Sequence, residues 1–387
     1  MPVHRILLAV ALGAAVAPPL AALPAAAAPT CANLSGSASA DLVRVQALDP
    51  QAFRLGRSPV GLRVAAARAT LSATHTTASA RGLETPLAVP VATATQQAPP
   101  APSKSGNQVA SAPVDLGVTR VGTGDLRAKA GWPDGSGCGS ASSGPSASSS
   151  AALVNAIVLP GTGGASLLRA PHNASSGADA GLTLGDRHTA TTVTARVGVA
   201  DLHLFEGTRE PVELRVVTAP TLSATAGGTA TRSSVRYTSP LIEVHRPNGI
   251  TQTLDAPAKR MDIPVAPATL GAFGLTGNGA VVLRLSIGTV SQRITATAVT
   301  AEAATLRVQL LGGGGNGATL VDLGVGVLQA SATAPAGTVP AAAPGGTLPV
   351  TGLNVGWLVG IGLLIAISGR LLLVLSRRRS ASAEQPR

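Results

Sequence analysis

Apolar and polar residues alternate with a period of two through much of the middle of this chain. In Leu214-Arg215-Val216 and in Leu283-Arg284-Leu285 an arginine stands between two apolar residues, so one side of each segment would face a core and the other would face water. Little of the region has helical periodicity or helix-capping residues. The pattern predicts an all-β fold of antiparallel strands. The segments that carry it most clearly are Leu42–Leu48, Leu62–Ser72, Thr191–Phe205, Val212–Val217, Leu241–His245, Val281–Ile287 and Thr305–Leu310.

One connection between these segments has a signal of its own. Arg246-Pro247-Asn248-Gly249 separates the strand-like segments Leu241–His245 and Ile250–Leu254. Asn-Gly pairs favour the tight turns that join neighbouring antiparallel strands. We therefore expect a β-hairpin at this position.

Several short blocks of sequence occur twice, in the same order. We interpret them as two related antiparallel β-sandwich-like units, 32–140 and 185–332, joined by a Ser/Gly/Ala-rich segment with short strands, 141–184. The alternative is convergence within a sequence dominated by Ala, Thr and Val. The paired blocks are Pro59–Val64 with Pro211–Val216, Thr70–Thr74 with Thr221–Thr225, Pro86-Leu87 with Pro240-Leu241, and Val114–Val118 with Val321–Val325.

Composition argues against two functional classes. Only 2% of the residues are aromatic, too few for the aromatic-lined pocket of a typical small-molecule enzyme or for a platform that stacks single-stranded nucleic acid. The net charge of +11 does not indicate a nucleic-acid partner either, because the run Arg377-Arg378-Arg379 lies in the C-terminal tail and the middle of the chain has no basic run.

Residues 1–27 are typical of a secretory signal peptide. His4 and Arg5 form a short basic start, Ile6–Leu20 is apolar, and Ala25–Ala28 supplies small residues for cleavage. The alternative, an uncleaved membrane anchor, is disfavoured because Pro18 and Pro19 interrupt the apolar segment. We expect the chain to be exported.

The C-terminal end combines three elements in order. Leu348-Pro349-Val350-Thr351-Gly352 follows a Pro/Ala/Gly-rich stalk (333–347) and precedes the apolar run Leu353–Leu375, which in turn precedes a basic tail (376–387). At about 1.5 Å per residue the apolar run is about 35 Å long as a helix, enough to cross a bilayer. Arg377, Arg378 and Arg379 would stop transfer and hold the tail inside the cell.

This arrangement resembles the sorting signal of LPxTG cell-wall-anchored surface proteins of Gram-positive bacteria, and the preference for Arg over Lys favours the actinobacteria among them. In that family the membrane transpeptidase sortase recognises the positions that match Leu348, Pro349, Val350, Thr351 and Gly352. It cleaves after the threonine and transfers its carbonyl to a peptidoglycan amine. The resemblance implies that Thr351 becomes covalently joined to peptidoglycan, that sortase is a transient partner, and that the membrane holds the chain before sorting.

A second string, Leu159-Pro160-Gly161-Thr162-Gly163, matches the same pattern but is not followed by a long apolar run. We interpret it as a Gly-rich loop after the strand Val154–Leu159, the alternative being a cryptic cleavage site.

Two cysteines, Cys31 and Cys138, would enter an oxidising compartment on export, which favours a disulfide between them over two free thiols.

Catalytic motifs are missing from the sequence. It contains no Gly-x-Ser-x-Gly, His-Glu-x-x-His, Walker or Cys-x-x-Cys motif, and His75, His172, His188, His203 and His245 are dispersed. We expect no enzyme activity, no catalytic residues, no cofactor and no metal. The favoured interpretation is a cell-wall surface protein that displays a β-rich surface to an unknown extracellular ligand. The alternatives are a structural envelope protein without a tight ligand, or a single-pass membrane protein if sortase does not process it.

Overall fold

The structure is a computed structural model and describes residues 34–53, 61–86, 89–99, 106–132, 145–171, 173–185, 188–256, 259–275, 279–313 and 317–336. In these ranges almost every residue in regular structure belongs to an antiparallel strand, and the strands form three sheets. The prediction of an all-β, antiparallel fold is therefore confirmed. Among the described residues no helix has the length and hydropathy that crossing a bilayer requires.

The first sheet, sheet A, brings together strands from the two ends of the chain. Its order is β20-β21-β23-β24-β1-β2-β3-β4, and β22 pairs with β23. Its members are β1 (Ser35–Leu48), β2 (Arg63–Leu71), β3 (Thr76–Glu84), β4 (Thr93–Ala98), β20 (Arg260–Val265), β21 (Val281–Ser286), β22 (Val290–Ile294), β23 (Ala298–Leu311) and β24 (Thr319–Thr333).

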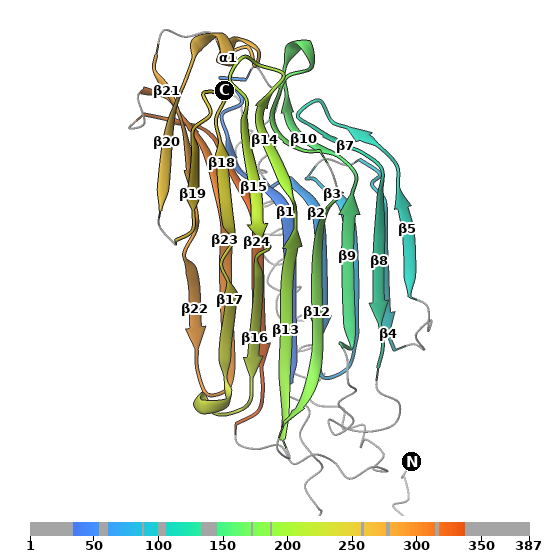
Figure 1. The fold of residues 1–387 in the computed structure, drawn as a ribbon. Coiled ribbons are helices and arrows are strands. Elements are labelled where there is room, and N and C mark those ends of the chain that lie inside the picture. Colours follow the sequence, from blue (N-terminus) through green and yellow to red (C-terminus); the bar gives the residue numbers. More distant parts are fainter. Residues whose placement is uncertain are drawn as a thin grey trace, which may run out of the picture.

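The other two sheets form the second layer and lie end to end (Figure 1). Sheet B has the order β17-β16-β13-β12-β9-β8-β5, and its members are β5 (Asn107–Ser111), β8 (Gly124–Ala130), β9 (Ala147–Leu153), β12 (Ala174–Gly185), β13 (His188–Gly198), β16 (Thr221–Ala226) and β17 (Ser234–Thr238). Sheet C has the order β19-β18-β15-β14-β11-β10-β7-β6, and its members are β6 (Val114–Asp115), β7 (Thr119–Val121), β10 (Ala156–Pro160), β11 (Ser166–Ala170), β14 (Asp201–Glu206), β15 (Val212–Thr218), β18 (Leu241–His245) and β19 (Thr251–Leu254).

Successive strands run antiparallel through both layers, and the last strand pairs with the first. Most strands pair with their neighbours in the chain, and the last strand, β24, pairs along its length with the first, β1, so that Ser35 lies opposite Thr333. We call the end of the sandwich with these two residues the Ser35–Thr333 end; it is at the bottom of Figure 1. The opposite, distal end carries the short helix α1 (Pro267–Gly271) and the turn Arg246–Gly249.

The core changes in character along the sandwich. Between sheets A and B, at the Ser35–Thr333 end, it consists largely of alanine, and Cα atoms of β2 come within 8 Å of those of β9 and β12. Stacked sheets are ordinarily about 10 Å apart, so small side chains allow an unusually close approach. Between sheets A and C, at the distal end, the core is built mainly from leucine and valine. The buried residues of this part include Val45, Leu48, Leu62, Val158, Leu202, Leu204, Leu214 and Leu323.

Two buried serines connect the closely packed layers. Ser176 Oγ of β12 donates a hydrogen bond to the backbone oxygen of Ala65 at 2.6 Å, and Ser149 Oγ of β9 donates one to the backbone oxygen of Arg68 at 2.9 Å. A buried hydroxyl needs such a partner to offset its desolvation. These contacts exist because the two backbones are close enough for a serine to span the gap.

The expected strand segments all overlap strands, with two changes. The strand expected at Val154–Leu159 begins only at Ala156. Thr191–Phe205 is two strands, β13 and β14, which separate at Val199-Ala200 where the chain passes from sheet B to sheet C. The hairpin at Asn248-Gly249 is present: β18 pairs with β19, and Gly249 has the positive φ of 75° that such turns require.

The expected boundaries of the two units do not coincide with boundaries between sheets. Strands β1–β4, from 32–140, and β20–β24, from 185–332, share sheet A. The physical reason is that β1 and β24 would each have an unpaired edge if the units were separate sandwiches. The expected joint, 141–184, contains the short strands β9, β10 and β11 and most of the longer β12, which pairs on both sides. The first stalk residue, Thr333, still belongs to β24, and Ala334 after it is buried.

Candidate functional site

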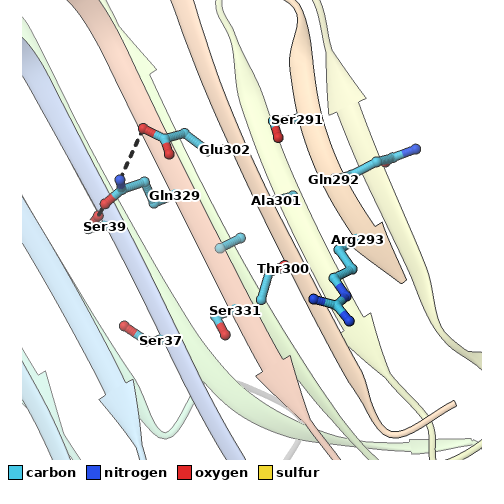
Figure 2. A pocket seen from close by; sticks show the side chains of 11 residues that line it. Ser37, Ser39, Ser291, Gln292, Arg293, Thr300, Ala301, Glu302, Gln329 and Ser331 are labelled. Atoms are coloured by element: carbon cyan, nitrogen blue, oxygen red, sulfur yellow. Dashed lines mark hydrogen bonds between the residues drawn. The ribbon is translucent and has the colours of Figure 1, made fainter. Parts of the chain in front are cut away.

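A polar hollow lies on the outer face of sheet A, close to the Ser35–Thr333 end (Figure 2). Its volume is about 390 Å³. Because side chains alternate between the two faces of a strand, polar side chains of β1, β23 and β24 lie on this face. The serines among them are short, so they leave a shallow depression in the surface. We call it the polar groove. Its lining residues are Ser37, Ser39, Ser291, Gln292, Arg293, Thr300, Ala301, Glu302, Gln329, Ala330 and Ser331.

Hydrogen bonds orient one side of the polar groove. Ser39 Oγ donates to Gln329 Oε1 at 3.0 Å, and Gln329 Nε2 donates to Glu302 Oε1 at 3.1 Å, as Figure 2 shows. Arg44 Nη1 lies 3.9 Å from the same carboxylate oxygen. These two hydrogen bonds fix which end of the Gln329 amide faces Ser39, because an amide oxygen only accepts and an amide nitrogen only donates.

Arg293 provides the charge on the other side of the polar groove. Its exposed side chain comes from β22 and lies on the Thr300 side of the hollow (Figure 2). Within the described ranges it forms no ion pair. The polar groove therefore offers hydroxyls, amides, one carboxylate and one uncommitted cation, but no aromatic or large apolar side chain. This chemistry suits a hydrated ligand rich in hydrogen-bonding groups.

Next to the polar groove, arginines and carboxylates form a network across sheet A. Asp41 is fully buried, and Arg44 donates to its Oδ2 through Nε at 2.9 Å and Nη2 at 2.6 Å. Burial alone would raise the pKa of Glu84, but the hydrogen bond and charge of Arg68, with the charges of Arg63 and Arg81, hold that pKa below its ordinary value. The Glu84 carboxylate, paired in this way, supports the sheet in its ionised form.

No cluster of three or more potential metal ligands occurs among the described residues. His75 Nδ1 is within hydrogen-bonding distance of Ser72 Oγ and Thr74 Oγ1 in a turn. His203 and His245 are on sheet C beside Glu206 and Glu243. The side chains of His172 and His188 are outside the described part of the chain.

The residues of the expected sorting signal are not among those that the structure describes. This applies to Leu348, Pro349, Val350, Thr351 and Gly352, to Arg377, Arg378 and Arg379, and to the segments 1–27 and 353–375. The expected disulfide partners, Cys31 and Cys138, are also outside the described ranges. These predictions remain predictions.

The internal copy of the pattern is part of the folded sandwich. Leu159 and Pro160 belong to β10, and Leu159 is buried. Thr162 begins a short 3₁₀ turn, and both its backbone nitrogen and its Oγ1 donate to the backbone oxygen of Ala272. The segment is therefore folded into a strand end and a turn and is not an extended peptide, although Thr162 and Gly163 are exposed.

The polar groove was not predicted from the sequence. The signal that could have found it is the spacing of Ser35, Ser37 and Ser39 on one face of a strand, together with Gln329 and Ser331 on another. These residues meet only because the first strand pairs with the last, and no local pattern indicates that pairing. Comparisons with family models, with curated proteins and with solved structures found nothing that matches this chain, so its function has to be inferred from its motifs and its surfaces.

Proposed function

We propose that this chain is an exported surface protein that sortase joins to peptidoglycan through Thr351, and that it displays a β-rich binding surface without catalysing a reaction. The observation that carries the proposal is that both ends of the described sandwich lie side by side. Ser35 and Thr333 lie side by side, with their hydroxyls 2.7 Å apart, so the chain enters and leaves the sandwich at the same end. The sorting motif follows Thr333 after a short connection.

The length of that connection supports an orientation. Residues 337–347, between the last described residue and Leu348, can span at most about 40 Å at about 3.4 Å per residue. The Ser35–Thr333 end would then face the wall. The distal end would point outward by the length of a strand such as β1, which is about 46 Å at about 3.3 Å per residue.

The proposal also covers the membrane segment, the repeated blocks, the two cysteines and the polar groove. Before sorting, Leu353–Leu375 spans the plasma membrane and Arg377–Arg379 hold the tail in the cytoplasm. The repeated blocks represent two related units whose strands have come to share one sandwich, and Cys31 and Cys138 form a disulfide. The polar groove binds an extracellular ligand that is rich in hydroxyl and amide groups.

Anchoring can be tested with single substitutions in the full-length chain. It would be expressed in a Gram-positive host with its sortase, and cell walls would be digested with a muralytic enzyme. We expect the unaltered chain in the wall digest, and Thr351→Ala and Leu348→Ala in the membrane fraction. Thr162→Ala, in the internal copy of the pattern, is the matched control and should leave the protein in the wall. Extraction of the unaltered chain by detergent alone would contradict anchoring and favour the single-pass membrane alternative.

A second experiment separates a binding role from a structural one. Residues 28–351 would be immobilised and exposed to peptidoglycan, wall polymers and matrix proteins at low and high salt. Saturable retention that survives salt and is lost in Ser39→Trp and Arg293→Ala would support the polar groove. Arg127→Ala is the control, because Arg127 is exposed and lies on the outer face of sheet B. No retention of any kind would favour a structural envelope protein, for which the close alanine packing of sheets A and B is a suitable basis.

A further inference from the structure

A second hollow lies at the distal end and has a different chemistry from the polar groove. It opens between sheet C and the edge strand β20 of sheet A and has a volume of about 530 Å³, within the range of pockets that hold small organic ligands. We call it the distal slot. Its lining residues are Phe205, Arg209, Glu210, Val212, Arg246, Pro247, Asn248, Ile263, Pro264 and Val265.

The inner part of the distal slot is apolar. Phe205 and Val212 come from sheet C and are 2% and 3% exposed, and Ile263 and Val265 come from β20 and are each 9% exposed. The ring of Phe205 meets the ring of Phe273 edge to face, with centroids 6.0 Å apart. Two of the three phenylalanines in the chain therefore gather at this corner. Phe205, Val212, Ile263 and Val265 belong to the buried core, so the inner wall of the slot is the edge of that core.

The distal slot stays open because two edge strands do not pair. β19 ends sheet C and β20 ends sheet A, and the wider leucine core keeps the two sheets apart here. Pro264 lies in β20 and has no N–H to donate. A proline in an edge strand prevents a further strand from adding to it. This argues against an extended peptide or a second copy of the chain as the occupant.

The mouth of the distal slot is cationic. Neither Arg209 nor Arg246 forms an ion pair with any residue in the described ranges. Arg246 Nη2 donates to Gln252 Oε1 at 2.8 Å, but its buried Nε has no acceptor. The one acidic residue in the lining, Glu210, accepts a hydrogen bond from the backbone nitrogen of Ala266 at 3.4 Å. Two guanidinium groups against one carboxylate leave the mouth with a net positive charge.

We propose that the distal slot binds a single-chain amphiphile with an anionic head, such as a fatty acid. The alkyl chain lies between Phe205 and the side chains of Ile263 and Val265, and the carboxylate lies between Arg209 and Arg246. An apolar lining alone would bind any hydrophobic molecule, but the two arginines at the mouth favour a ligand with a negatively charged head group. The site is separate from the polar groove and does not depend on how the protein is anchored.

Calorimetric titration of residues 28–351 with decanoate, undecanoate and dodecanoate below their micellar concentrations tests the proposal. We expect saturable 1:1 binding that tightens by up to about fourfold with each added methylene, the value that burial of one CH₂ at about 0.8 kcal/mol implies. Dodecanol should bind at least about tenfold more weakly than dodecanoate, because it lacks the charge that the arginines recognise.

Variants then locate the site. Arg209→Ala with Arg246→Ala should weaken dodecanoate binding about tenfold or more and leave dodecanol binding nearly unchanged, whereas Ile263→Trp should block both ligands. Arg127→Ala, on the outer face of sheet B and away from both hollows, is the matched control and should bind like the unaltered protein. Circular dichroism and thermal unfolding would check that each variant is folded. If Ile263→Trp does not fold, the double arginine variant still tests whether the carboxylate is bound at this site. Absence of saturable binding, affinity that does not depend on chain length, or an unaffected double arginine variant would overturn the proposal.

Discussion

A single methyl group added at Gly36 tests how closely the two layers pack. In a strand, replacing glycine by alanine ordinarily stabilises a protein by about 0.5–1 kcal/mol, because the unfolded chain loses less entropy on folding. At Gly36 in β1, however, a Cβ would lie 2.6 Å from Val193 Cγ1 and 2.8 Å from Thr191 Cγ2 of the opposing sheet. Both neighbours are β-branched and have few alternative rotamers. Overpacking of this kind costs about 1–3 kcal/mol, so we expect Gly36→Ala to lower the free energy of unfolding by about 1–2 kcal/mol.

Urea unfolding of residues 28–351, followed by circular dichroism, would measure the effect. Gly271→Ala in α1 is the matched control, because nothing lies within 4 Å of a Cβ built there and alanine is the better helix former. The control should be unchanged or up to about 1 kcal/mol more stable. If Gly36→Ala were as stable as the control, sheets A and B would not be held at the short distance that the alanine core implies, and the reasoning would fail.

Three further predictions concern single polar groups. Ser176→Ala removes the hydrogen bond from β12 to the backbone of β2, and urea unfolding should show a loss of about 1 kcal/mol. Burial alone would raise the pKa of Glu84, but the hydrogen bond and charge of Arg68, with the charges of Arg63 and Arg81, together hold it below its ordinary value of 4.5. Its stabilisation is therefore complete above pH 4.5 and is lost as pH falls through the lower folded value; Glu84→Gln should flatten that part of a stability-against-pH profile. Burial raises the pKa of Tyr237 to about 12, and since it is the only tyrosine, absorbance at alkaline pH reports it directly. A midpoint near 10 would contradict its burial, and Tyr237→Phe, which removes a buried hydroxyl without a partner, should be at least as stable as the unaltered protein.

Strands could be predicted from the sequence because their signal is local. The alternation in Leu214-Arg215-Val216 lies within a few residues, and it places Leu214 in the core and Arg215 outside, as the structure has them. The Asn248-Gly249 turn is equally local. Pairing between β1 and β24 is not, since it joins segments almost the whole folded chain apart. The repeated blocks suggest a division of the chain into two units. An unpaired edge strand, however, is stabilised by pairing with any suitable edge strand, including one from the other unit.

Candidate binding sites were harder to predict for the same reason. Arg293 and Ser37 have no sequence relationship that marks them as neighbours, and they line one hollow because β22 and β1 flank β23 and β24. Dispersed histidines and the lack of catalytic motifs were visible at once, since those signals depend on residue type and short spacing. A surface made from four separate strands leaves no such mark.

Scarcity of aromatic residues connects the fold with both candidate sites. A sandwich without large rings can be filled by alanine only if its sheets come close together, and by leucine only if they stay further apart. This chain does both, with the narrow half at the Ser35–Thr333 end and the wide half at the distal end. In the narrow half the small side chains bring the described strands of sheets A and B close together, and the polar groove lies on the outer face there. In the wide half Phe205 and Phe273 are placed where the sheets part, and the opening there is apolar inside. The change from alanine to leucine along the strands therefore accompanies a change in the hollows, from a polar one on the outer face to one with an apolar lining at the distal end.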